Sequence, residues 1–95
     1  MTIDVDRVEE NETQFVFEVL LDENDRVPPF TVTVDKSYYE HLTGGTVSPE
    51  ILVEESFVFL IEREPKEGIL REFNLSYIAR YFPEYEQEIK KYFTE

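Results

Sequence analysis

One stretch of the chain, from Ser48 to Glu64, constrains the fold more than any other. The Ser48 hydroxyl is suited to accept a hydrogen bond from the free backbone N–H groups of a first helical turn. Pro49 suits the first helical position, because the donor that it lacks would have no partner there. Pro65 is the signal that ends the element. The stretch is therefore predicted to form a helix.

The apolar side chains of this helix occupy several of its sides. One face repeats at helical spacing and a second, narrower stripe accompanies it. The two sets are Val53, Phe57, Leu60 and Ile61, and then Leu52 and Phe59. Because a helix of this kind is covered by protein from more than one direction, we expect it at the centre of the fold. The alternative is a strand over 57–61, a short β-prone run; the length of the element and its caps favour the helix.

Three segments with strand-like alternation precede this helix. They are Thr2–Glu9, with Ile3 and Val5 inward, Thr13–Leu21, with Phe15, Phe17, Val19 and Leu21 inward, and a third with Phe30, Val32 and Val34 inward. Val8 breaks the alternation and indicates a bulge or a strand end. Asn11-Glu12 suits a tight turn, and residues 22–29 form a polar loop. The segments predict an antiparallel meander with one buried face.

Three shorter helices are expected around the central one. The first runs through Leu42, with Asp35 or Ser37 as its N-cap and Gly44-Gly45 as its stop. The second spans Leu75–Phe82 behind the cap Asn74, and the third begins at Pro83, with an apolar stripe made of Tyr85, Ile89, Tyr92 and Phe93. Residues 66–74 show no clear period, although Ile69, Leu70 and Phe73 are expected to be buried. The predicted fold is one α+β domain over 1–95, a three-stranded antiparallel meander packed against a central helix with three shorter helices.

The charge of the chain is strongly negative and unevenly distributed. The net charge is −13, and residues 1–62 carry fifteen acids against three bases while residues 63–95 are nearly balanced. Affinity for nucleic acid rests mainly on basic residues that neutralise phosphates, so nucleic acid is disfavoured as a partner, as are anionic membranes. A basic protein partner is compatible with this charge. The alternative is that the acids only keep a small protein soluble.

Cysteine usage and hydropathy bear on the compartment. The chain has no cysteine, which suits a reducing environment. No apolar run approaches the roughly 18 residues of a membrane span, and the N-terminal region lacks the pattern of a signal peptide. The expected location is the cytoplasm.

Motifs for catalysis or metal binding are incomplete. Residues 22–25 resemble the opening of a calcium loop, but Val27 stands where that loop needs glycine and Thr33 where it needs a bidentate glutamate. His41 is the single histidine, and its simpler roles are surface or helix end. We therefore expect no catalytic residue, no metal ligand and no cofactor, and no enzyme; the alternative is an enzyme or ligand binder around His41.

Aromatic residues with polar tips are the best candidates for an interaction surface. The candidates are Tyr38, Tyr39, His41, Tyr77, Tyr81 and Tyr85. Half-exposed tyrosines are typical of interfaces. They are equally typical of small hydrophobic cores in which the ring is buried and the hydroxyl group stays in contact with water. Tyr38 and Tyr39 are neighbours on a helix, so both cannot face one core.

Residues 30–64 resemble a ribbon-helix-helix domain in outline. F-T-V-T-V is followed by D-K-S-Y-Y-E-H-L, a glycine turn and then S-P-E-I-L-V-E-E-S-F-V-F-L-I-E-R-E. The resemblance implies a dimer that pairs this strand between subunits and reads DNA through Thr31, Thr33 and Asp35. The whole chain, including R-Y-F-P-E-Y-E, otherwise resembles short proteins of microbial genomes.

The sequence thus favours a small acidic module for protein interaction or regulation, without catalysis, with a basic protein or a second copy of the chain as partner. The alternative, from the resemblance, is an antitoxin-like or DNA-binding regulator of the ribbon-helix-helix type.

Overall fold

The computed structural model describes residues 2–21 and 29–93 of the chain. Its elements are β1 (Ile3–Glu10), β2 (Gln14–Leu21), β3 (Phe30–Asp35), α1 (Lys36–Thr43), α2 (Pro49–Arg63), the 3₁₀ turn η1 (Lys66–Gly68), β4 (Glu72–Asn74), the 3₁₀ turn η2 (Leu75–Tyr77), α3 (Ile78–Tyr81) and α4 (Tyr85–Lys90). The calcium-like stretch 22–25 and nearly all of the loop predicted over 22–29 lie outside the described residues. The predicted α+β class is confirmed.

The sheet has four strands in the order β1-β2-β3-β4. The first three are antiparallel neighbours, as predicted, but β4 pairs with β3 in parallel, with Thr31 opposite Glu72 and Thr33 opposite Asn74. The prediction of three strands was therefore wrong by one. A strand of three residues is too short to show alternation, and its parallel partner lies far back in the sequence, beyond α1 and α2.

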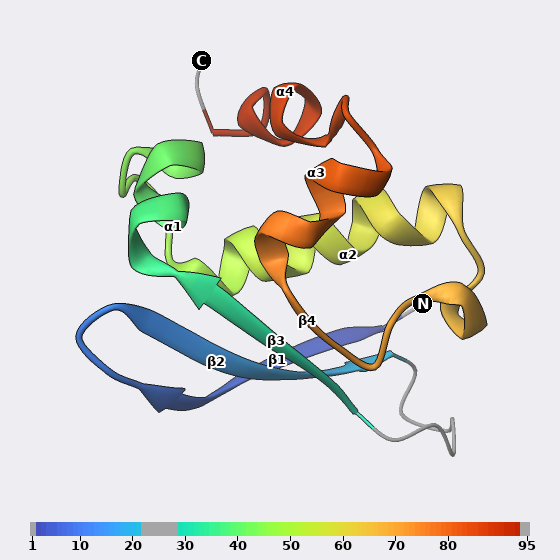
Figure 1. Ribbon diagram of the computed structural model, residues 1–95, viewed down its shortest axis with the longest axis horizontal. Helices are drawn as coiled ribbons and strands as arrows, with labels where there is room; N and C mark the ends of the chain where they lie inside the picture. The colour runs from blue at the N-terminus through green and yellow to red at the C-terminus, as the bar shows by residue number, and fades with distance from the viewer. Residues whose placement is uncertain (1, 22–28, 94–95) are drawn as a thin grey trace.

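All the helices lie on one side of this sheet (Figure 1). The alternation predicted for the second and third strands is confirmed, since the inward pairs Phe15 with Val34, Phe17 with Val32 and Val19 with Phe30 are all buried. Along β1 the pairing register shifts between Arg7 and Glu9, and Val8 is 52% exposed. The expected bulge is thus at Val8. Asn11 forms the expected turn, because its Oδ1 accepts hydrogen bonds from the backbone N–H groups of Thr13 and Gln14.

Helix α2 begins and ends where the sequence indicates. The Ile51 N–H donates to Ser48 Oγ, Pro49 occupies the first turn, and the helix stops before Pro65. The alternative of a strand over 57–61 is wrong. Figure 1 shows α2 between the sheet on one side and α3 and α4 on the other. Its two-sided burial is therefore confirmed.

Two phenylalanines of α2 show what covers each side. Phe57 faces the sheet, where its ring centroid lies 5.5 Å from Phe30 and 6.1 Å from Phe73. Phe59 faces the later helices, at 5.8 Å from Phe82 and 5.2 Å from Tyr85. Both rings are buried, and each such side chain contributes about 1.5–3 kcal/mol of hydrophobic stabilisation.

Helix α1 ends at a glycine turn, as predicted. Gly44 has φ of 66°, and its N–H donates to the Glu40 carbonyl. Gly45 also has positive φ, and a Cβ there would lie 2.8 Å from a carboxylate oxygen of Glu40. At the other end Asp35 stands at the N-cap position, but its side chain accepts a bond from Gln14 Nε2 and does not cap the helix.

The C-terminal part differs from the prediction in detail. Asn74 caps as expected, by accepting from the Ser76 N–H, but η2 and α3 stand where one helix over 75–82 was expected. In the predicted apolar stripe of the last helix, Tyr85 and Ile89 are buried, whereas Tyr92 is 57% exposed. Because α4 ends at Lys90, the helical spacing that predicted an inward Tyr92 does not continue that far.

A buried chain of hydroxyl groups joins α2 to α4. Ser56 Oγ lies 2.7 Å from the Leu52 carbonyl and 2.6 Å from Tyr85 Oη. A serine hydroxyl has a single proton, which it donates to the carbonyl, so Tyr85 must donate to Ser56. Both side chains have no exposed area. Burial raises the pKa of Tyr85 well above its ordinary value, with a lowering contribution from Ser56 that does not offset it.

This direction predicts unequal effects of two substitutions. Ser56→Ala leaves the Tyr85 hydroxyl buried without an acceptor and should lower the free energy of unfolding by about 1–3 kcal/mol. Tyr85→Phe removes a donor while Ser56 keeps its bond to Leu52, and should cost only about 0.5–1.5 kcal/mol. In the Ser56→Ala background, Tyr85→Phe should restore part of the loss. Urea unfolding of the four proteins measures this, and additive losses would contradict it.

Arg7 ties the edge of the sheet to the start of α2. Its Nε and Nη2 each lie 2.9 Å from a carboxylate oxygen of Glu50, and its Nη1 lies 3.0 Å from Glu10. The guanidinium also stacks over Phe15, at 4.8 Å from the ring centroid. The hydrogen bonds from Arg7 hold the pKa of Glu50 below its ordinary value, although partial burial opposes them.

A lowered pKa in the folded state means that Glu50 stabilises the protein above its unfolded pKa and loses that effect as the pH falls through the folded pKa. Glu50→Gln should therefore cost about 0.5–1 kcal/mol at neutral pH, a value that allows for partial exposure. The difference in unfolding free energy between Glu50→Gln and the parent protein should disappear at acid pH. Glu12→Gln, in the exposed turn, is the control. Unfolding titrations across the acid range measure both, and a gap that is independent of pH would contradict the assignment.

Candidate functional site

An open pocket of about 200 Å³ lies between the C-terminal end of α2 and the segment that runs from η1 to α3. We call it the tyrosine groove. It is lined by Leu60, Glu64, Gly68, Ile69, Leu70, Phe73, Tyr77, Ile78, Tyr81 and Phe82.

The groove forms because the chain turns sharply after α2. Pro65 prevents continuation of the helix, and η1 reverses the chain over Lys66–Gly68. A Cβ on Gly68 would lie 3.3 Å from a carboxylate oxygen of Glu64, so glycine leaves room for that carboxylate beside the turn. The chain then returns to the sheet as β4, which places Phe73 opposite Val32.

The floor of the groove is buried and its rim is exposed. Leu60, Ile69, Phe73 and Ile78 form the floor and are each at most 8% exposed. Leu70, Tyr77 and Tyr81 form the rim, with exposed fractions of 48%, 39% and 65%. The expectation that Leu70 is buried was wrong: Ile69 and Phe73, on either side of it in the sequence, are buried, whereas Leu70 lies at the rim. The groove thus combines a buried apolar base with an exposed apolar rim.

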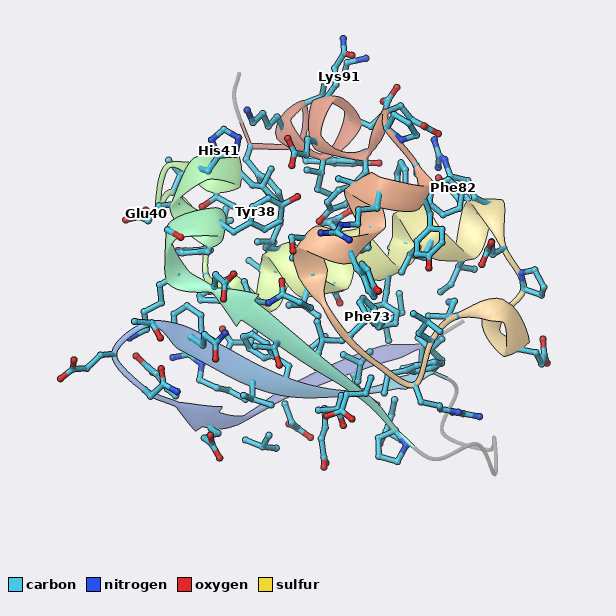
Figure 2. All side chains as sticks on the ribbon, viewed as in Figure 1. Tyr38, Glu40, His41, Phe73, Phe82 and Lys91 are labelled. Atoms are coloured by element: carbon cyan, nitrogen blue, oxygen red, sulfur yellow. The ribbon has the colours of Figure 1, made fainter. Side chains whose placement is uncertain are left out.

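The two rim tyrosines are positioned by their spacing and by Arg80. Tyr77 and Tyr81 are four residues apart across η2 and α3, and their ring centroids lie 5.8 Å apart at an interplanar angle of 61°. The Arg80 guanidinium lies 5.4 Å from the centroid of the Tyr77 ring. At the back of the groove, Phe82 packs edge-on against Phe59. Figure 2 shows Phe82 beside α2 and Phe73 below α3.

The chemistry that the groove offers is nonpolar contact, two tyrosine hydroxyls and one carboxylate. Its lining contains no His, Cys, Ser or Lys. Glu64 forms no ion pair with any side chain that the structure describes. Within residues 2–21 and 29–93, no group of three or more His, Cys, Asp or Glu side chains is arranged to hold a metal ion. These features suit recognition of an apolar group that has a positive charge nearby.

The α1 candidates lie elsewhere, against α4. Tyr38 is half-buried and donates its hydroxyl to Glu86 Oε2 at 2.8 Å. His41 is exposed, stacks beside Tyr38 at 6.3 Å and has Nε2 3.9 Å from Glu86 Oε1 (Figure 2). His41 therefore lies on the surface beside one carboxylate and outside the tyrosine groove.

Tyr39 points the other way from Tyr38, as the helix geometry requires. Its hydroxyl donates to the Val47 carbonyl, and its ring meets Phe15 edge-on at 5.9 Å. Tyr39 therefore ties α1 to β2 and to the loop before α2.

The structure divides the predicted interaction residues into three groups. Tyr77 and Tyr81 share the tyrosine groove, while Tyr38, Tyr39 and His41 belong to α1. Tyr85 is fully buried and bonded to Ser56, so it belongs to the core and its place on a surface was wrong. Sequence reasoning missed Ile69, Leu70 and Phe73 as lining residues because they fall in the segment without a period. The four-residue step between Tyr77 and Tyr81 was the one available signal.

The strand identified by the ribbon-helix-helix resemblance lies inside the sheet. β3 pairs with β2 on one edge and with β4 on the other. Pairing of Thr31 and Thr33 with a second copy of this strand would require displacement of β2 or β4. Their side chains share the uncovered face of the sheet with Glu18 and Glu72, which would face the phosphates of any bound DNA.

Comparisons with known proteins identify no relative. The chain matches no protein-family model, and no curated protein and no solved structure resembles it significantly. Among the described residues, no helix combines the length and the apolar character that are needed to cross a bilayer.

The contact between Tyr38 and Glu86 predicts a loss of stability in alkali. Burial, and then the bond donated to a carboxylate, raise the pKa of Tyr38. A raised folded pKa stabilises the protein fully below the unfolded tyrosine pKa of about 10, and this effect is lost as the pH rises further. Tyr38→Phe should cost about 0.5–1.5 kcal/mol at neutral pH and should make the alkaline decline shallower. Unfolding free energy as a function of pH tests this, and identical slopes for both proteins would contradict it.

Proposed function

We propose that this chain is a small protein-interaction module that binds an apolar segment of a partner protein in the tyrosine groove. The observation that carries the proposal is the exposed rim of Leu70, Tyr77 and Tyr81 above a buried apolar floor. Exposed apolar groups gathered at one concave place are typical of binding surfaces. Tyrosine is favoured there because it gives a large contact area for little loss of side-chain entropy.

The size of the groove favours side chains over a cofactor. Its volume of about 200 Å³ lies below the roughly 300–1,000 Å³ of small-molecule sites. One or two apolar side chains of a partner suit this volume. Such side chains would contact Tyr77 and Tyr81 and would remove Leu70 from water, which is the main source of affinity in such a contact.

The charge of the chain favours a partner with basic residues beside the apolar anchor. Glu64 lies in the groove with its carboxylate unpaired among the described side chains, and the net charge of the chain is −13. A lysine or arginine next to the anchor would meet Glu64 and would be attracted over a longer range by the acids. A second copy would instead bring a second Glu64 and another −13, so a foreign basic segment is the favoured occupant.

A displayed peptide library, selected against the folded protein, tests the proposal. Selected peptides should share an apolar anchor next to Lys or Arg, and their binding should weaken as salt is added. Tyr81→Ala should weaken binding about tenfold or more, because an anchor contact at a binding site is typically worth that much. Tyr92→Ala is the matched control, since Tyr92 is exposed to a similar degree on the segment after α4.

Two outcomes would contradict the proposal. Peptides that bind Tyr81→Ala and Tyr92→Ala equally well would place the site elsewhere. A parent protein that forms a dimer, and that becomes monomeric in Tyr81→Ala but not in Tyr92→Ala, would show that a second copy occupies the groove.

A further inference from the structure

Strand β1 is an edge strand of the sheet. It lies first in the order β1-β2-β3-β4, and none of the described residues forms a backbone hydrogen bond with its outer edge. This order places β1 at the opposite edge of the sheet from β4. The outer edge therefore presents free N–H and C=O groups in the geometry of a strand, which is the arrangement to which an extended peptide adds.

The inward side chains of this edge are incompletely covered. Ile3 and Val5 pack against the core but are only half-buried, whereas their cross-strand partners Leu21 and Val19 are buried. Helix α2 contacts β1 on this face. A strand added beyond β1 would place its own inward side chains next to Ile3 and Val5 and would complete their burial.

The outward side chains at the same edge are acidic. Asp4 and Asp6 are exposed on the uncovered face of the sheet, opposite Leu20 and Glu18 of β2. Neither aspartate forms an ion pair with any residue that the structure describes. Outward side chains of an added strand would therefore lie beside two carboxylates that form no ion pair within the described part of the chain, and opposite charges at such cross-strand positions are stabilising.

We propose that the outer edge of β1 binds an extended segment of a partner protein in which Lys or Arg alternates with apolar residues. The basic residues pair with Asp4 and Asp6, and the apolar residues cover Ile3 and Val5. The regular part of the edge runs from Ile3 to Arg7, because the bulge at Val8 interrupts the register beyond it. This inference is separate from the tyrosine groove, which lies on other elements.

The same charges make a second copy a poor occupant of this edge. Antiparallel pairing of two β1 strands about Val5 would place Asp4 of each strand opposite Asp6 of the other. Parallel pairing in register would place each aspartate beside its equivalent. Like charges at cross-strand positions are destabilising, and charged edge strands commonly prevent self-association in this way. The charges at this edge therefore disfavour pairing with a second copy of the chain and favour pairing with a basic strand.

Synthetic peptides that alternate Lys with Val test the proposal, alongside peptides that alternate Glu with Val and a scrambled version of the Lys peptide. The alternating Lys peptide should bind best, and it should slow amide hydrogen exchange along Ile3–Arg7. Asn substitutions at both Asp4 and Asp6 should weaken it roughly fivefold, since two cross-strand charge pairs are lost. The control replaces Glu67 of η1 and Glu72 of β4 with Gln, for the same change in net charge outside β1.

Two further measurements separate strand addition from general attraction to an acidic protein. Alternate amides of a strand face opposite edges, so N-methylation of one alternate set of peptide amides should abolish binding while the other set is tolerated. Tyr81→Ala should leave binding unchanged, which distinguishes this site from the tyrosine groove. Equal binding of the scrambled peptide, equal loss in the control variant, or no protection along β1 would each overturn the proposal.

Discussion

The two-sided burial of helix α2 is the constraint on which the rest of the structure depends. Phe57 packs against the sheet, and Phe59 packs against the helices that follow. A helix with apolar groups on both sides cannot remain at the surface, so the sheet and the C-terminal helices must meet it from opposite directions. The hydroxyl chain from Tyr85 through Ser56 to Leu52 adds a directional, buried link between α2 and α4. Hydrophobic contacts have no preferred direction. The hydrogen bonds therefore fix the position of α4 on α2 more strictly than the hydrophobic contacts alone would.

The parts of the fold that could be predicted from the sequence are those that depend on local sequence signals, such as caps, turns and alternation. Ser48 and Pro49 determine the start of α2, Gly44 determines the end of α1, and Asn74 determines the start of η2. The alternation of residues in β2 and β3 determines which face of each strand is buried. Strand β4 could not be predicted, because it owes its extended form to pairing with β3 and its three residues carry no period. The inward position expected for Tyr92 was wrong for a related reason, since periodicity does not show where α4 ends.

The tyrosine groove illustrates the same limit for function. Tyr77 and Tyr81 could be singled out from their spacing and chemistry, and both are at the rim. Their floor could not be predicted, because Leu60 of α2, Ile69 of the segment after η1 and Phe73 of β4 meet only after β4 joins the sheet. Tyr85, of the same residue type and the same four-residue step, lies in the core because α4 turns it toward Ser56. Residue type therefore suggested candidates, and tertiary contacts separated the surface members from the buried one.

The parallel pairing of β4 with β3 has a consequence for the order of assembly. Thr31 meets Glu72 only after the chain between them, which includes α1 and α2, has folded back across the sheet. Contacts between distant parts of a chain form late, since the loss of loop entropy must precede them. Phe73 of the groove floor lies at this junction, so the floor should be incomplete in any early folding intermediate that lacks β4. A partner that recognises the groove would then bind fully folded molecules and would not bind incompletely folded ones.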